Sequence, residues 1–207
     1  KNLCGAGVVF YLLIALRKTL RDQDYFDNLN LKEPNLLKLL DLVALATIAD
    51  MVKMDFNNRV LVHHGLKVIR SQQCNLGLKK IFQLTNKSHL NALTSDLSFV
   101  IAPKINAAGR MDDMSLGVAC LTATNEYEAH HYAKQLIEFN FQRKKTEADM
   151  QDDAQAIMQG FNKSNKTICL FNDQWHQGVI GILASRLKDN FYRPVIIFAQ
   201  DDSGQLK

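Results

Sequence analysis

Apolar residues recur at helical spacing along most of the chain. The segment from Val8 to Leu20 is apolar nearly all round, which predicts a helix buried in a core. A second buried helix is predicted over 36–48, after Pro34-Asn35. A third is expected to begin at Asn57-Asn58 as its cap. Three shorter helices are predicted over 77–84, 96–103 and 115–121. The first 124 residues are therefore expected to be mostly helical, with polar loops over 21–32 and 86–94.

A much longer helix is predicted next. Asn125 and Glu128 have the spacing of a capping box, and neither proline nor glycine interrupts the sequence before Gly160. One helix over 125–161 follows from this pattern.

The stripe along this long helix is apolar at both ends and polar in the middle, where Asn140, Arg143 and Glu147 lie. Two interpretations remain open. The helix either bridges two domains and directs these polar groups into the cleft between them, or has an exposed middle held by an Arg143–Glu147 pair at i, i+4. The pattern does not decide between them.

The period changes after residue 166. Strands are predicted over 167–171 and 194–199, with a helix over 178–190 between them and the start of a third strand at 205–207. His176 precedes the helix, and Arg186 lies beside a face of small residues on it. A helix start of this kind can hold an anion, although Trp175 and His176 suit ordinary loop packing equally well. The predicted class is therefore α/β, mostly helical and then mixed.

Composition adds limits rather than a function. The 207 residues are 47% hydrophobic and carry 25 basic against 21 acidic side chains, a bias of +4 that is compatible with a nucleic-acid or phosphate ligand without requiring one. The longest apolar run, Val8 to Leu16, is about half the length that a membrane-spanning helix needs. The four cysteines are widely spaced and are expected to be reduced and mostly buried, which argues against zinc and disulfides: Cys4, Cys74, Cys120 and Cys169.

The stretch from Ile101 to Met111 is a candidate anion site. Pro103 is expected to end the preceding helix, and Ala107, Ala108 and Gly109 leave a bare backbone next to the guanidinium of Arg110. The stretch is therefore not expected to form a regular helix. A tight packing loop in which Arg110 pairs with a carboxylate remains an equal alternative.

Asp50 follows an apolar run. A carboxylate in that position is a helix cap, a turn residue, or a ligand held ionised by a metal or another cation. Spacing alone favours the cap or turn.

Four segments together resemble consecutive motifs of the RecJ family of single-stranded-DNA exonucleases, in the DHH phosphoesterase superfamily. They read Leu3-Cys-Gly-Ala-Gly-Val8, Asp41-Leu-Val-Ala-Leu-Ala-Thr-Ile-Ala-Asp50, Ile101-Ala-Pro-Lys-Ile-Asn-Ala-Ala-Gly-Arg-Met111 and Trp175-His-Gln-Gly-Val-Ile-Gly-Ile-Leu-Ala-Ser-Arg-Leu187. The resemblance extends over essentially the whole chain, in the right order and spacing.

The resemblance implies a two-metal hydrolase that degrades single-stranded DNA from its 5′ end and releases nucleoside 5′-monophosphates. Residues 1–124 would form the C-terminal part of the DHH catalytic domain, 125–161 the connecting helix, and 162–207 the N-terminal part of the DHH-associated substrate-binding domain. Two Mn²⁺ or Mg²⁺ ions would lie in the cleft between the domains. Single-stranded DNA is the implied substrate, in cytoplasmic DNA repair and recombination, with a single-stranded-DNA-binding protein and a helicase as implied partners and no membrane.

The resemblance also implies roles for particular residues. Asp50 would be a metal ligand and catalytic, and His176 would act near the scissile phosphate. The expected substrate-binding residues are Asn106, Arg110, Asn140, Arg143, Lys144 and Arg186. Lys144 stands where the family often has glutamine, which leaves the details of its DNA contact open.

One departure from the family is larger than any substitution. The upstream aspartate motif and the Asp-His-His triplet of the family occur nowhere in the chain, and His63-His64 and His130-His131 are not displaced copies. We expect an internal segment that binds metal poorly and is inactive by itself. Two other functions remain open: a degenerate RecJ-like scaffold that binds DNA without cutting it, and a phosphodiesterase acting on short oligonucleotides or cyclic dinucleotides.

Overall fold

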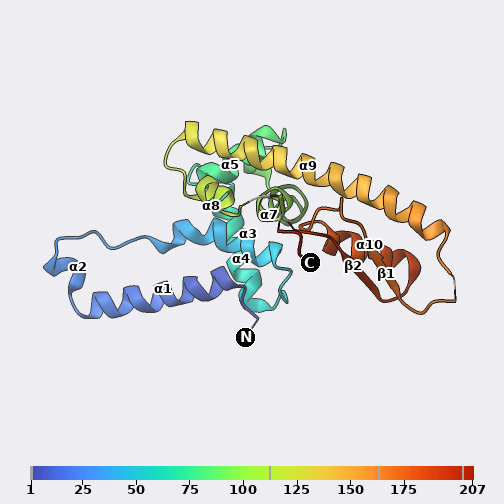
Figure 1. Cartoon of the computed structure of the whole chain (residues 1–207). Helices are drawn as coiled ribbons and strands as arrows, with labels where there is room; N and C mark the ends of the chain where they lie inside the picture. The colour runs from blue at the N-terminus through green and yellow to red at the C-terminus, as the bar shows by residue number, and fades with distance from the viewer. Residues whose placement is uncertain (1, 112, 163, 202) are drawn as a thin grey trace. The chain divides into compact units, whose positions relative to one another are not determined.

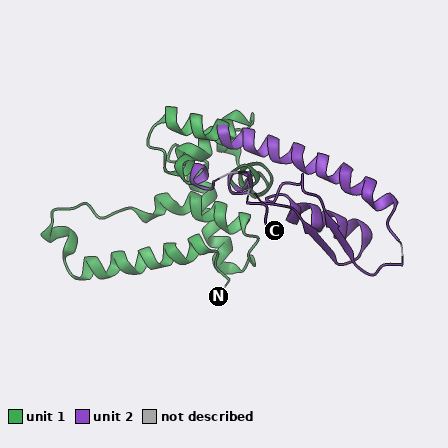
Figure 2. Cartoon of the chain, in the orientation of Figure 1, with its two compact units in different colours: residues 1–105, 118–134 green, residues 106–117, 135–207 purple. Residues whose placement is uncertain are grey.

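The structure is a computed structural model that describes residues 2–111, 113–162, 164–201 and 203–207. The chain is mostly helical with one small parallel sheet, as the sequence predicts. It divides into two compact units, residues 1–105 with 118–134 and residues 106–117 with 135–207 (Figure 2). Three helices each have residues in both units: α7 (Ala102–Met111), α8 (Ser115–Thr122) and α9 (Glu126–Gln159). Neither unit is therefore a continuous stretch of chain.

Unit 1 consists of helices (Figure 1). Its elements are α1 (Gly5–Asp22), α2 (Tyr25–Asn28), η1 (Leu36–Leu39), α3 (Leu40–Ala49), α4 (Phe56–Ile69), α5 (Leu76–Leu84), η2 (His89–Asn91), α6 (Thr94–Asp96), η3 (Leu97–Ile101), most of α8 (Ser115–Thr122) and the first turns of α9 (Glu126–Gln159). Helix α4 begins after Asp55, whose side chain accepts a hydrogen bond from the backbone N–H of Asn58 at 3.0 Å. The predicted cap at Asn57-Asn58 is therefore two to three residues late.

Two glycines allow the helices of unit 1 to pack closely. A Cβ atom at Gly65 would lie 2.2 Å from the carbonyl oxygen of Leu40, so α4 crosses α3 at a point where only glycine fits. Likewise, a Cβ atom at Gly77 would lie 2.2 Å from the carbonyl oxygen of Cys120. Close backbone contact therefore fixes α3 to α4 and α5 to α8.

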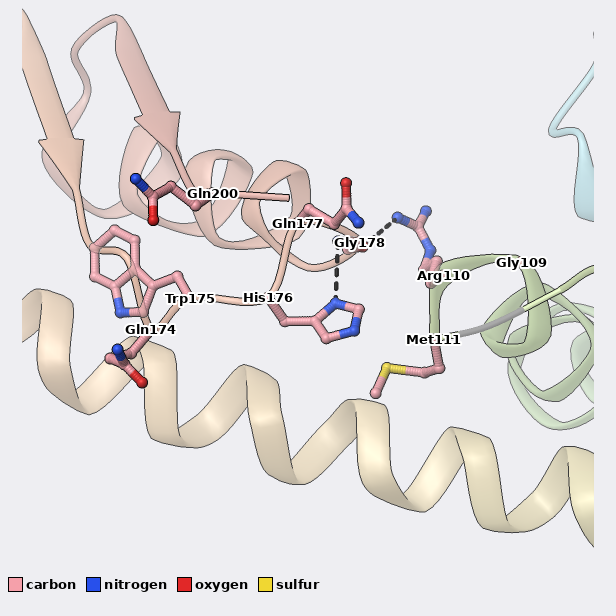
Figure 3. A pocket seen from close by; sticks show the side chains of 9 residues that line it. All are labelled: Gly109, Arg110, Met111, Gln174, Trp175, His176, Gln177, Gly178 and Gln200. Carbon is pink, nitrogen blue, oxygen red and sulfur yellow. Dashed lines mark hydrogen bonds between the residues drawn. The ribbon is translucent and has the colours of Figure 1, made fainter. Parts of the chain in front are cut away.

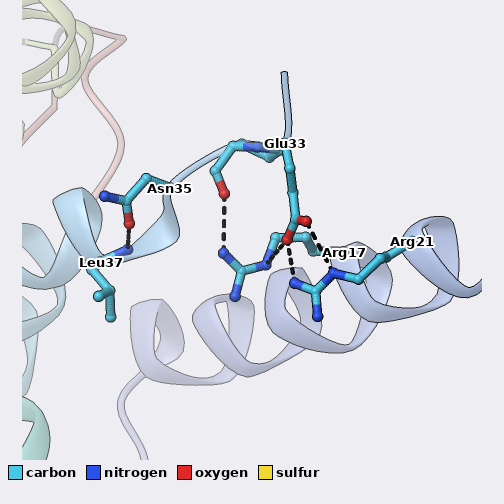
Figure 4. A network of polar contacts seen from close by, with 6 residues as sticks. Arg17, Arg21, Glu33, Asn35 and Leu37 are labelled. Atoms are coloured by element: carbon cyan, nitrogen blue, oxygen red, sulfur yellow. Dashed lines mark hydrogen bonds and ion pairs between the residues drawn. The ribbon is translucent and has the colours of Figure 1, made fainter. Parts of the chain in front are cut away.

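The loop before η1 is tied to α1 by a polar network (Figure 4). The carboxylate of Glu33 pairs with the guanidinium groups of Arg17 and Arg21, and Arg17 also donates to the carbonyl oxygen of Pro34 at 3.0 Å. Asn35 then caps η1 by accepting from the backbone N–H of Leu37. These contacts hold an otherwise exposed loop against the end of α1.

Helix α1 is less buried than its composition predicts. Gly7 and Phe10 are its buried residues, whereas Val8, Leu12 and Leu16 are about half exposed or more. The prediction of a helix inside a core was wrong for this chain. The described residues cover one stripe of α1, and its other apolar side chains face outward.

The prediction that 101–111 is not a regular helix was also wrong. Residues 94–111 form one helical run, in which the π-helical segment η3 leads into α7 (Ala102–Met111). The backbone N–H of Ala102 bonds to the carbonyl of Leu97, five residues back, so the hydrogen-bond ladder has already shifted where Pro103 arrives without an N–H. The π-turn thereby allows a proline inside this helix, at a position where a regular α-helical hydrogen-bond pattern would exclude it.

Unit 2 contains a parallel pair of strands. Strand β1 (Ile168–Phe171) pairs with β2 (Val195–Phe198), with Ile168 opposite Val195, and α10 (Ile180–Phe191) connects them. Buried side chains of α10 and of the second half of α9 belong to one hydrophobic cluster with residues of both strands and Trp175. Figure 1 shows the backbones of these elements. Leu206 forms an isolated antiparallel bridge with Gln200, in the segment where a third strand is expected to start.

The long helix and the cysteines largely match their predictions. Helix α9 covers 34 residues, and its cap forms as expected, since Asn125 Oδ1 accepts from the N–H of Glu128 at 2.9 Å. Cys4, Cys74 and Cys120 are buried and unpaired, but Cys169 is exposed. Among the described residues, the search for a helix of sufficient length and hydrophobicity to cross a membrane gives no candidate.

Candidate phosphate-binding site

The site begins with the end of α7, which carries Arg110 into unit 2 (Figure 3). Ala107 and Ala108 are fully buried, so they anchor the helix by packing and do not leave a bare backbone open to a ligand. Arg110 is exposed, and within the described part of the chain no carboxylate pairs with it. Asn106 is exposed one turn earlier, on the same face of α7.

The second part of the site is the turn between β1 and α10. Asn172 opens the turn by accepting from the backbone N–H of Gln174 at 2.9 Å through its side chain. Trp175 is 2% exposed, and its indole N–H points to a carboxylate oxygen of Asp153 on α9 at 3.4 Å. The buried indole therefore anchors the turn, and the next residue, His176, lies at the partly exposed edge.

Gly178 joins these two parts. An ideal Cβ atom at this position would lie 1.8 Å from the carbonyl oxygen of Arg110, so the two backbone segments touch, although 68 residues separate them. The carbonyl of Gly178 accepts a long hydrogen bond of 3.5 Å from Arg110 Nη1, and its N–H donates to His176 Nδ1 at 3.1 Å (Figure 3). One glycine thus contacts both candidate functional side chains.

The hydrogen bond to His176 has a chemical consequence. Because Nδ1 accepts from Gly178, the neutral ring carries its proton on Nε2. The Nε2–H can then donate to an anionic oxygen, while most donors of the Arg110 guanidinium make no hydrogen bond to the residues that the structure describes. The pair is suited to binding a phosphate.

These residues line a cavity of about 630 Å³ within unit 2, a size typical of small-molecule sites. Its lining residues are Gly109, Arg110, Met111, Gln174, Trp175, His176, Gln177, Gly178 and Gln200 (Figure 3). The predicted Arg110 and His176 are therefore brought together, and Gln174 and Gln200 are polar members that the sequence pattern did not single out.

The structure brings Arg143 and Arg186 together at a different point of unit 2. Both pair with the carboxylate of Glu147, Arg143 from the preceding turn of α9 and Arg186 from α10. The i, i+4 pair of Arg143 and Glu147 does form, but the alternative of an exposed middle is wrong, because Asn140 and Glu147 are only 6% and 5% exposed. Lys144 is exposed on α9, beside Arg143 in sequence.

Asp50 lies in unit 1, exposed at the C-terminal end of α3. Its backbone N–H bonds to the carbonyl of Ala46 at 2.9 Å, so the residue ends the helix. No group of three or more histidine, cysteine, aspartate or glutamate side chains able to hold a metal occurs among the described residues. These residues therefore do not fit a two-metal centre by themselves.

The contacts of Gly178 with Arg110, and of Glu147 with Arg143 and Arg186, were difficult to predict from the sequence. The Arg143–Glu147 spacing is visible, but the second arginine of Glu147 lies 39 residues further along the chain. The small-residue face predicted for this helix consists of Gly178, Gly181 and Ser185, and α10 begins two residues after Gly178. Gly178 makes a close backbone contact, whereas a Cβ atom at Gly181 would meet nothing within 4 Å and Ser185 is exposed.

Comparison with known proteins gives consistent matches, although no protein-family model matches the chain. The chain is 46% identical over 211 residues to the single-stranded-DNA-specific exonuclease RecJ of Salmonella typhimurium, covering all of this chain and 37% of that protein. It therefore spans little more than a third of the length of the curated relative.

Solved structures agree in fold. An exonuclease RecJ bound to manganese superimposes with a TM-score of 0.78 at 31% identity, over 96% of this chain and 47% of that one. RecJ of Thermus thermophilus in complex with Mg²⁺ gives a TM-score of 0.74 at 32% identity, over 94% of this chain and 29% of that one. These matches confirm the resemblance to RecJ along essentially the whole of the chain.

Proposed function

We propose that the complete protein containing this chain is a single-stranded-DNA exonuclease that hydrolyses DNA from the 5′ end and releases nucleoside 5′-monophosphates. The observation that carries the proposal is the cavity in which Arg110 and His176 lie together, in a chain 46% identical to a RecJ exonuclease. Repair and recombination in the cytoplasm are the proposed setting, with a single-stranded-DNA-binding protein and a helicase as proposed partners.

The proposed residue roles follow from hydrogen-bonding chemistry. Arg110 binds a non-bridging phosphate oxygen through its guanidinium, and Asn106 supports the same strand from the preceding turn. His176 donates its Nε2–H to a phosphate oxygen near the bond that breaks. Contacts of this kind position the strand without reading its sequence.

A second group of residues is proposed to hold the strand further along. Arg143, Lys144 and Arg186 supply positive charge, and Asn140 supplies an amide. Neutralisation of phosphates by such side chains makes binding fall as salt rises. The salt dependence of binding thus reports on this group.

Divalent metal dependence is part of the proposal. The relatives of known structure contain Mn²⁺ or Mg²⁺, and Asp50 is the proposed ligand in this chain. Because the described residues make no metal centre alone, we expect the isolated chain to bind metal poorly and to lack activity. The proposed domains are the C-terminal part of the catalytic domain (1–124), the connecting helix (125–161) and the N-terminal part of the DHH-associated domain (162–207).

The test uses the complete protein and a single-stranded oligonucleotide labelled at either end, with manganese or with chelator. Mononucleotide release from the 5′ end that stops with chelator and in Asp50→Ala is the expected result. Because Asp50 is exposed at a helix end, its replacement should leave the fold intact, which thermal unfolding checks.

Two other outcomes would replace the proposal. DNA binding without cleavage would indicate a scaffold. Cleavage restricted to substrates of a few nucleotides, or to cyclic dinucleotides, would indicate a phosphodiesterase of the same superfamily.

A further inference from the structure

Glu147 lies between two guanidinium groups, and each of its carboxylate oxygens contacts a different one. Oε2 pairs with Arg143 Nη1 at 2.5 Å, and Oε1 pairs with Arg186 Nε. The Glu147 side chain is 7% exposed and that of Arg143 12%, whereas that of Arg186 is 54% exposed. The cluster therefore connects a buried carboxylate to the surface through one arginine.

The contacts leave part of each guanidinium unused. Arg186 contacts Glu147 through Nε, and its side chain is half exposed, so its two terminal nitrogens make no contact with Glu147 in this pair. Arg143 Nε is buried and makes no hydrogen bond to any residue that the structure describes. Two arginines and one glutamate carry a net charge of +1, so the cluster attracts an anion.

A further polar atom lacks a partner on the same helix face. Asn140 lies one turn before Arg143 and is 6% exposed, and its Oδ1 has no hydrogen-bond partner among the described side chains and backbone. Buried polar groups are rarely left unpaired in folded proteins. Because an amide oxygen accepts hydrogen bonds and a phosphodiester has none to donate, this atom does not bind the strand itself, and the inference rests on the two arginines and Glu147.

We propose that Glu147 is a positioning residue, which is held by the buried Arg143 and fixes the direction of the half-exposed Arg186 so that the terminal N–H groups of Arg186 receive a phosphodiester of single-stranded DNA. The proposal rests on the proposed function, since the ligand is the strand that the exonuclease would hold. A guanidinium held through one edge keeps its other edge pre-oriented, which reduces the entropy lost on binding.

Neutralising Glu147 separates positioning from simple charge. Glu147→Gln removes a negative charge, so a cluster that acted only through its net charge would bind DNA more tightly. If Glu147 positions the arginines, the same change should weaken binding about tenfold, the effect of losing roughly one charge-assisted contact. The two mechanisms therefore predict opposite signs.

The matched control is Asp149→Asn. Asp149 is exposed two residues further along α9 and has no ion-pair partner among the described residues, so its replacement makes the same charge change without touching the arginines. The dissociation constant for a 5′-phosphorylated oligonucleotide is measured in chelator with the complete protein. We expect Asp149→Asn to bind as the wild type or slightly more tightly, and Glu147→Asp to recover part of the lost affinity.

Equal or tighter binding by Glu147→Gln than by Asp149→Asn would overturn the proposal. If Glu147→Gln does not fold, Arg186→Lys decides, because it keeps the charge on a half-exposed side chain but removes the fork, and wild-type affinity in that variant would also overturn the proposal. A wild-type protein that binds no DNA would refute the proposed function and this inference together. Normal wild-type binding with an unchanged Glu147→Gln would refute the inference alone.

Discussion

Among the glycines whose surroundings the structure describes, Gly178 has the least room for a side chain. A methyl group there would overlap the carbonyl oxygen of Arg110, a backbone atom that moves only if the end of α7 moves. We expect Gly178→Ala to lower the free energy of unfolding by about 1–3 kcal/mol, the usual range for overpacking. It should also lower the DNA affinity of the complete protein, because both Arg110 and His176 contact this glycine. Urea unfolding and oligonucleotide binding measure the two effects.

Gly181 is the matched control, since it lies three residues further along and its Cβ would meet nothing within 4 Å. Gly181→Ala should raise the free energy of unfolding by up to about 1 kcal/mol, because alanine is the better helix former and restricts the unfolded chain. Equal stability changes of the same sign in the two variants would contradict the contact between Gly178 and Arg110.

Individual site residues were only partly predictable from the sequence. Arg110 and His176 were identified from their types and neighbours, and both line the cavity. The glycine contact between them depends on two segments 68 residues apart, and local spacing does not contain that information. The roles of all the predicted site residues stay predictions, those of Asp50 and Lys144 as much as those of Arg110 and His176.

At the scale of elements, α10 ends with a strained residue. Tyr192 has φ 53° and ψ 42°, the left-handed conformation that glycine usually adopts after a helix, and its N–H bonds to the carbonyl of Lys188 at 2.9 Å. Its side chain is 92% exposed and contributes little burial. Tyr192→Gly should therefore raise the free energy of unfolding by about 1 kcal/mol, through relief of the left-handed strain. Thermal unfolding of the chain measures it.

Tyr192→Ala separates backbone strain from the loss of the ring. Alanine keeps the Cβ atom that causes the strain, so this variant should gain no stability. A gain of the same size in both variants would show that the exposed ring, and not the backbone conformation, is unfavourable.

The elements themselves were more predictable than their surroundings. The capping signal at Asn125 and the absence of breakers identified α9, because these are local features. Pro103 misled the prediction for 101–111, since a π-turn before it removes the conflict that proline normally creates in a helix. Helix α1 was located correctly, but its burial was not, because burial depends on which other segments cover it.

At the scale of the whole molecule, three helices of unit 1 are joined by one polar chain. The carboxylate of Asp41 on α3 accepts from the backbone N–H of Asn75 at 2.8 Å, and Asn75 Nδ2 donates to the carbonyl of Leu121 on α8 at 2.7 Å. Asn75 also caps α5 by accepting from the N–H of Leu78. The sequence places Asp41 in an apolar run but does not reveal these partners. Asn75 lies 34 residues after Asp41 in the chain, and Leu121 lies 46 residues after Asn75.

Asp41 gives unit 1 a pH dependence opposite to that of an ordinary salt-bridged aspartate. Burial raises the pKa of the Asp41 carboxyl, against the lowering effect of the hydrogen bonds from Asn75 and Leu42. The folded state therefore binds the proton more tightly than the unfolded state, so the contribution of Asp41 to stability is full below its ordinary pKa and is lost as pH rises through its raised pKa. Cys74 does not titrate in this window, because burial, with the charge of Asp41, raises the pKa of its thiol to about 12.

Asp41→Asn cannot titrate, so the free energy of unfolding of the wild type minus that of the variant should increase on acidification from neutral pH to about 4. Urea unfolding of both proteins at matched pH measures this difference, and a difference that is constant or that decreases would show that folding does not raise the pKa of Asp41.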